Sequence, residues 1–93
     1  MKLPHKVRIT AKQAYEIFRV PRFENPDNLG ECRLKSKQIG LVDELKGKEL
    51  IKSAIHEILH AISEEYEIKI PHNLIYELEE PLYKVLKLNG WIK

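Results

Sequence analysis

Two histidines and a glutamate near the middle of the chain carry its strongest chemical signal. The segment His56-Glu57-Ile58-Leu59-His60 matches the HExxH pattern. Residues four positions apart lie on the same face of a helix, so the imidazoles of His56 and His60 can reach one zinc ion. Glu57 is rotated by about 100° from His56, because a helix has 3.6 residues per turn. We expect its carboxylate to serve as general base toward a metal-activated water.

The alternative is a chance match on an ordinary amphipathic helix. The apolar face of this helix contains residues 51, 55, 58, 59 and 62. His56 and His60 lie at the border of that face, on the same side as Lys52 and Ser53. A histidine packed in the core would lie at the centre of the apolar face, and a solvated pair would lie far from it. The border is where the wall of a cleft would be, which favours the metal site.

A third ligand must come from elsewhere, because catalytic zinc is usually held by three protein ligands and keeps one position open for water. The downstream helical segment offers Glu77, Glu79 and Glu80. If this segment packs antiparallel to the HExxH helix, the edge of its apolar face at Glu79 comes alongside the histidines. Glu77 borders the opposite edge, and Glu80 points largely away. We therefore expect Glu79 to be the third ligand, and Glu80 and Glu77 remain alternatives to it.

If the metal-activated water attacks a peptide bond, the site also needs a hydrogen-bond donor that stabilises the oxyanion of the tetrahedral intermediate. His72, Tyr76 and Tyr83 are close enough in sequence to the expected site to be candidates. Each has an alternative role. The two tyrosines could be packing residues at a boundary, and His72 could belong to the start of a helix that Asn73 caps.

Length and composition limit the protein to one small domain, residues 1–93. Of the 93 residues, 43% are hydrophobic and 32% are charged, which is ordinary for a soluble globular protein. A formal charge of +2 does not indicate nucleic-acid binding. Cys32 is the sole cysteine, which excludes an intrachain disulfide and a cysteine-rich zinc site. With no apolar segment long enough for a signal peptide or a bilayer span, we expect a cytoplasmic protein that is not bound to a membrane.

The patterns of apolar residues predict strands in the first half and helices in the second. Short strands are expected at residues 7–10, 14–20, 31–34 and 38–42. Lys35-Ser36-Lys37 reads as a hairpin turn, and the proline-containing stretch 22–30 reads as an irregular loop. Helical spacing covers residues 48–66 and 74–86, and Pro81 should kink or split the second helix.

These elements predict an α+β fold, with a small, mainly antiparallel sheet packed on two helices and the zinc held between the helices. Within this arrangement the strand at 38–42 could be an edge strand that pairs with an extended peptide. The alternative is that this strand only covers the helices.

The HExxH motif followed by a glutamate from a downstream helix resembles the gluzincin metallopeptidases. Glu79 follows His60 after eighteen residues, and Glu80 follows it after nineteen; both spacings look like ones used in that clan. The segments 54–62 and 78–83, together with Leu29-Gly30-Glu31-Cys32, are similar to small HExxH proteins found in phages and prophages. The resemblance covers about the C-terminal two-thirds of the chain and is specific at the HExxH helix. It implies a minimal zincin-like fold without the second subdomain of full-size gluzincins.

The sequence therefore predicts a zinc-dependent metallopeptidase that acts on a peptide or protein substrate. His56, His60 and Glu79 would bind Zn²⁺, and Glu57 would be the general base. A second hypothesis is a non-catalytic binding module that zinc stabilises. A third, a nucleic-acid-associated accessory protein, has only the slight basic excess in its favour.

Overall fold

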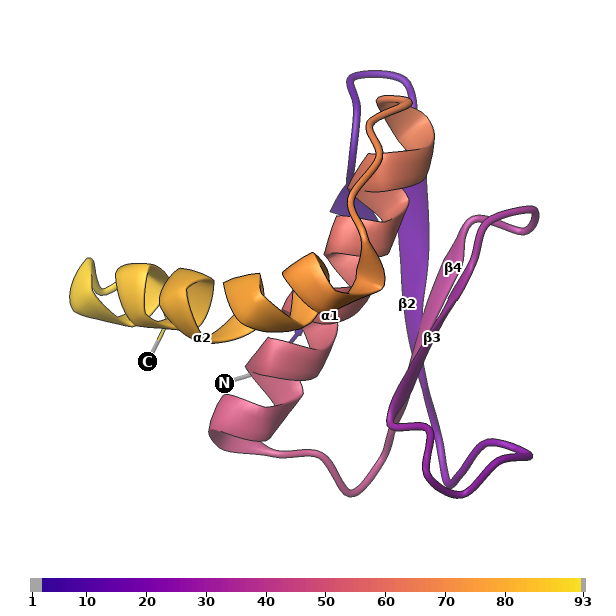
Figure 1. Ribbon diagram of the computed structural model, residues 1–93. Helices are drawn as coiled ribbons and strands as arrows, with labels where there is room; N and C mark the ends of the chain where they lie inside the picture. Colours follow the sequence, from indigo (N-terminus) through magenta and orange to yellow (C-terminus); the bar gives the residue numbers. More distant parts are fainter. Residues whose placement is uncertain (1–2, 93) are drawn as a thin grey trace.

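A computed structural model describes residues 3–92 and has an α+β architecture, as predicted. Four strands come first and two helices follow: β1 (Lys6–Arg8), β2 (Ala14–Val20), β3 (Gly30–Arg33), β4 (Gln38–Val42), α1 (Gly47–Glu65) and α2 (His72–Leu88). The strands form one sheet, α1 packs against it, and α2 crosses α1 (Figure 1). The predicted β2 and β4 have the observed bounds, and the other elements differ from the prediction by a few residues at their ends.

The sheet has the strand order β1-β2-β4-β3. β1 and β2 are antiparallel, as are β3 and β4, but β2 and β4 are parallel. The suggestion that β4 is an edge strand is therefore wrong, because β2 and β3 pair with its two sides. Four of its five residues are buried, and a strand buried on both faces is usually an interior one. The edge strand nearest to α1 is β3.

α1 is held on the sheet by an apolar cluster that includes the fully buried side chains of Tyr15, Ile39 and Leu41. From α1, the cluster receives Leu50, Ala54 and Ala61. Alanine at two of these positions lets the helix backbone approach the strands closely. The approach matters for the site, because it brings residues on one side of α1 under β3.

α2 packs on another side of α1. Ile51, Ile55 and Leu59 of α1 form a second apolar cluster with Ile75 of α2 and with Ile92. α2 begins at His72, directly after Pro71, so the expected capping position at Asn73 lies inside the first turn. The helix continues through Pro81 to Leu88, so Pro81 does not split it. Neither helix in the described part of the chain is long and apolar enough to cross a membrane.

One polar network ties the end of α1 to the sheet. The Tyr15 hydroxyl donates a hydrogen bond to Glu65 Oε2 over 2.7 Å, and Lys37 Nζ forms an ion pair with the same oxygen. The hydrogen bond from Lys37, followed by the one from Tyr15 and by the positive charge of Lys37, lowers the pKa of the Glu65 carboxyl. Both partners favour the ionised carboxylate in the folded protein.

This network predicts a pH-dependent contribution of Glu65 to folding stability. Since the carboxyl pKa is lower in the folded than in the unfolded state, the contribution is complete above the unfolded value of about 4.3 and is lost as the pH falls through the folded value. Urea unfolding of the wild type and of Glu65→Gln should therefore differ at pH 7, and the difference should shrink at acid pH. Glu24→Gln, at an exposed loop position, is the control. A difference that does not depend on pH would contradict the prediction.

Candidate metal centre

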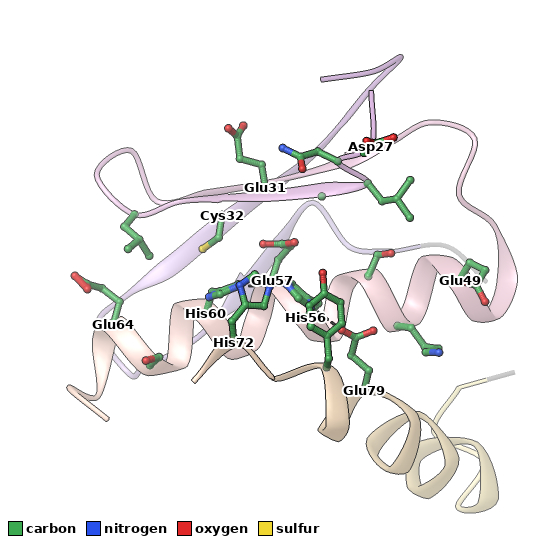
Figure 2. Close-up of a pocket in the computed structure, with 18 residues that line it drawn as sticks. Asp27, Glu31, Cys32, Glu49, His56, Glu57, His60, Glu64, His72 and Glu79 are labelled. Atoms are coloured by element: carbon green, nitrogen blue, oxygen red, sulfur yellow. Dashed lines mark hydrogen bonds and ion pairs between the residues drawn. The ribbon is translucent and has the colours of Figure 1, made fainter. Parts of the chain in front are cut away.

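Three imidazoles meet in the angle between the two helices. The metal-ligating atoms of His56, His60 and His72 all lie within 4.8 Å of one another. His56 and His60 come from adjacent turns of α1, and their Nε2 atoms are 3.3 Å apart. His72 is the first residue of α2, and its ring centroid is 5.0 Å from that of His56 and 5.1 Å from that of His60. Such a group of donors can hold one metal ion (Figure 2).

Glu79 lies beside this cluster and contacts His56. Its Oε2 is 2.6 Å from His56 Nδ1, and both side chains are mostly buried. Nδ1 is the ring nitrogen opposite to Nε2, the atom that faces His60. A hydrogen bond from Nδ1–H to a carboxylate fixes the tautomer that leaves Nε2 free as a ligand. Glu79 is thus placed to orient His56 as a metal ligand. Its own predicted role as the third ligand stays a prediction.

The two alternatives to Glu79 lie away from the cluster. Glu80 forms ion pairs with Lys48 and Lys52 of α1, at 3.0 and 3.4 Å. These lysines hold the Glu80 carboxyl in its charged form and lower its pKa, with the hydrogen bond from Lys48 as the largest cause. Glu77 is exposed and does not line the cleft that contains the histidines.

Glu57 points from α1 toward β3 and is 6% exposed, the one buried charged residue in the described part of the chain. Burial is the main reason why its carboxyl pKa rises to about 7. Neighbouring His56 lowers that pKa, and the negative charges of Glu79 and Glu31 raise it. Such a carboxyl group can exchange a proton near neutral pH, which is the property that a general base needs.

Gly30 provides the space for the Glu57 carboxylate. A Cβ atom at Gly30 would lie 2.8 Å from Glu57 Oε2 and 3.2 Å from its Cγ. The first residue of the edge strand must therefore lack a side chain if the carboxylate is to lie between α1 and β3. This close approach explains the glycine before Glu31-Cys32 in physical terms.

The surroundings of His60 suit metal binding. Burial, followed by the neighbouring rings of His56 and His72, lowers the pKa of His60. His60 is therefore neutral at pH 7, and a neutral imidazole is the form that binds a metal. Cys32 also lines the cleft, but burial and the nearby Glu57 raise its thiol pKa to about 12. It stays protonated and is a poor ligand.

An open cleft of about 560 Å³ gives access to the cluster. One wall is the edge strand β3 with the loop before it, and the floor is one side of α1. The first two turns of α2 close the other side. The lining residues are Asp27, Asn28, Leu29, Gly30, Glu31, Cys32, Leu34, Glu49, Lys52, Ser53, His56, Glu57, His60, Ser63, Glu64, His72, Tyr76 and Glu79.

The two candidate tyrosines have different positions. Tyr76 lines the cleft and is 63% exposed; its ring stacks on His72 with centroids 4.9 Å apart and lies 4.8 Å from the ring of His56. Tyr83 packs against the apolar cluster between the helices, under Lys48, and does not line the cleft. Of these two tyrosines, Tyr76 is therefore the one that can present its hydroxyl near the three histidines.

Sequence reasoning placed His72 near the site but did not assign it to the metal, and it gave Gly30 no role at Glu57. One signal was present for His72. The chain has four histidines, and the last of them, the next one after the HExxH pair, follows a short connection between two helices. Such a connection returns the start of the second helix to the end of the first, where His60 lies. No comparable signal links Gly30 to Glu57, because they belong to different elements.

No protein-family profile matches the chain, and no match is found among curated proteins or solved structures.

The close approach at Gly30 predicts a steric coupling with Glu57. Gly30→Ala should destabilise the protein by about 1–3 kcal/mol, the usual cost of overpacking a well-packed position. In a Glu57→Ala background the same substitution should cost less, because two of the three nearest atoms to the new methyl group, Oε2 and Cγ of Glu57, are then gone, although Leu41 Cδ2 at 3.2 Å remains. Chemical denaturation of the four proteins of this double-mutant cycle measures the coupling. Equal costs in the two backgrounds would show that Glu57 does not occupy the space beside Gly30.

Proposed function

We propose that this protein is a zinc-dependent peptide hydrolase in which His56, His60 and His72 hold the metal and Glu57 is the general base. The observation that carries the proposal is the meeting of three imidazoles beside a buried carboxylate in an open cleft. Catalytic zinc sites commonly have three protein ligands and one open position, and three histidines are a known ligand set.

The donor set fits zinc. Zn²⁺ prefers nitrogen and sulfur ligands, and neutral imidazoles from two helices can surround it without charge repulsion. Glu79 fixes His56 through Nδ1, as the outer partner of a zinc-bound histidine usually does. When bound, zinc lowers the pKa of a water molecule and polarises a carbonyl oxygen.

The residues of the chain supply the remaining steps. Glu57 lies one helix position from His56 and faces the cleft, so its carboxylate can take a proton from the attacking water. The same carboxyl group can then give that proton to the leaving amine. Tyr76, which stacks on His72, can donate a hydrogen bond from its hydroxyl to the carbonyl oxygen of the substrate.

The shape of the cleft supports a peptide as substrate. β3 pairs with β4 on one side only, so its other side has backbone donors and acceptors free of any strand partner within residues 3–92. An extended chain can pair with such an edge, and its side chains then alternate between the cleft and solvent. The sequence suggested β4 as the edge strand that pairs with an extended peptide, and we assign this role to β3 instead.

Metal content tests the ligand assignment. His60→Ala and His72→Ala should each reduce bound zinc from one ion per chain to a small fraction, because each removes a direct ligand. Glu79→Gln should keep the metal but weaken its binding by about 10–100-fold, the usual effect of losing an outer partner. Elemental analysis and a competition titration with a chelator measure both effects.

His5→Ala is the matched control, because His5 is exposed and is the one histidine outside the cluster. If Glu79→Gln removes zinc as completely as His60→Ala does, and His72→Ala leaves it bound, then Glu79 is the third ligand and our assignment of His72 is wrong. Unchanged zinc in all of these variants would overturn the metal site.

Activity tests the role of Glu57. Glu57→Gln should keep the zinc and the fold but reduce cleavage of a peptide library by about 10²–10⁴-fold, because general-base catalysis contributes that much. Glu64→Gln, which changes another carboxylate that lines the same cleft, should leave the rate within a few fold. Wild-type cleavage that Glu57→Gln does not reduce would contradict the mechanism.

A zinc-stabilised binding module is the second candidate. The observation that favours it is that the three histidines come from both helices, so a metal would cross-link α1 and α2. In such a protein, removal of zinc would separate or unfold the helices, while the wild type would cleave no peptide under any condition. The activity assay and a chelator-induced unfolding experiment together distinguish the two functions.

A further inference from the structure

The side of α2 next to the one that contacts α1 carries a row of apolar side chains, which we call the outer stripe: Leu74, Leu78, Pro81, Val85 and Leu88. Leu78 is half-buried, and the other four are exposed. Leu74 is 39%, Val85 50% and Leu88 85% exposed. The spacing alternates between four and three residues, which is the repeat of a helix that packs lengthwise against another helix.

Leu74, Pro81, Val85 and Leu88 of the outer stripe lie outside both apolar clusters, and Leu78, at its inner edge, also packs against the cluster between the helices. α2 packs on α1 through Ile75, Leu82 and Leu86, which lie about a quarter turn around the helix. The C-terminal half of α2 extends beyond α1 and away from the sheet (Figure 1). A second helix can therefore approach the stripe along its length. Large apolar side chains gathered on one exposed face commonly mark a binding surface.

The outer stripe is nearly symmetric about Pro81. Leu74 precedes Pro81 by seven positions and Leu88 follows it by seven, while Leu78 and Val85 lie three before and four after it. When two copies of α2 pack antiparallel with Pro81 at the centre, each apolar residue of one copy meets an apolar residue of the other. A two-fold symmetric interface requires this kind of self-complementary surface.

The charges beside the stripe have the same symmetry. Glu77 and Lys84 are both exposed and flank the stripe on the same side, seven positions apart. Within residues 3–92 neither forms an ion pair. In the antiparallel arrangement Glu77 of each copy lies across from Lys84 of the other, so two ion pairs form. In a parallel two-fold arrangement the flank that carries Glu77 and Lys84 would face the opposite flank of the other copy, so these residues would not meet, and the pattern favours the antiparallel arrangement.

We propose that the outer stripe is the interface of a homodimer, with the α2 helices of two copies packed antiparallel about a two-fold axis at Pro81. Trp91, which follows α2 and is 72% exposed, then lies at the level where α2 of the second copy begins. It adds an aromatic side chain to each end of the interface.

Sedimentation and fluorescence test the proposal on the full chain. The wild type should show a concentration-dependent mass that approaches twice 10.9 kDa. Trp91 is the sole tryptophan, so its emission should move to shorter wavelength as the dimer forms. Val85→Glu should give a monomer with unchanged helix content, because Val85 is half exposed in the single chain. A wild type that stays monomeric up to about 1 mM, the concentration at which association amounts to about 4 kcal/mol, would overturn the proposal.

Charge reversal tests the orientation. Glu77→Lys and Lys84→Glu should each weaken the dimer about tenfold, because two attractive pairs become two repulsive ones. The double variant restores opposite charges and should return the dissociation constant to within about threefold of the wild type. Ile68→Glu, at an exposed apolar position outside α2, is the control and should leave the dimer intact. A dimer that resists Val85→Glu, or a double variant as weak as the single ones, would overturn the antiparallel interface.

Discussion

The structure depends on the way in which α1 packs on two partners at once. Ala54 and Ala61 bring it close to the sheet, while Ile51, Ile55 and Leu59 bury a second side against α2. Between these two sides, one part of the α1 surface is covered by neither the sheet nor α2. His56 and His60 lie on that part, where they are half-buried and reachable from solvent. The cleft is thus a consequence of core packing on either side of it.

The same packing explains why a charged group can be buried at Glu57. A carboxylate that leaves water loses solvation energy, which is why its pKa rises to about 7. An apolar residue would fill this space between α1 and β3 at lower cost in stability. A protein that retains a buried carboxyl group beside three histidines gives up stability at that position, and such local costs are typical of functional sites.

The topology of the sheet places the wall of the cleft. Because β2 and β4 are parallel, the chain must pass from one end of the sheet to the other between them, and β3 is formed on the return. This makes β3 an edge strand above α1, and it sets Gly30 against Glu57. A simple antiparallel meander would have placed β3 between β2 and β4, and its backbone would then have had strand partners on both sides.

The fold class and the position of the HExxH helix follow from the sequence alone. The apolar content of residues 14–20 and the turn before residues 38–42 predicted β2 and β4 with their observed bounds, and helical spacing placed α1 to within one residue at each end. His56 and His60 share one face because their separation along a single helix determines it. These properties are local, since each depends on residues that belong to the same element.

Only the tertiary structure decides which residues from other elements reach that face. The sequence favoured Glu79 for the third ligand, whereas in the folded chain Glu79 contacts Nδ1 of His56 and His72 joins the two imidazoles. The sequence also suggested β4 as the edge, where the structure has β3. Both outcomes depend on how the connection after α1 turns and on how strands pair across the sheet. Periodicity reports which face of an element is buried, but it does not report which partner covers it or at what angle, because those depend on contacts between residues far apart in the chain.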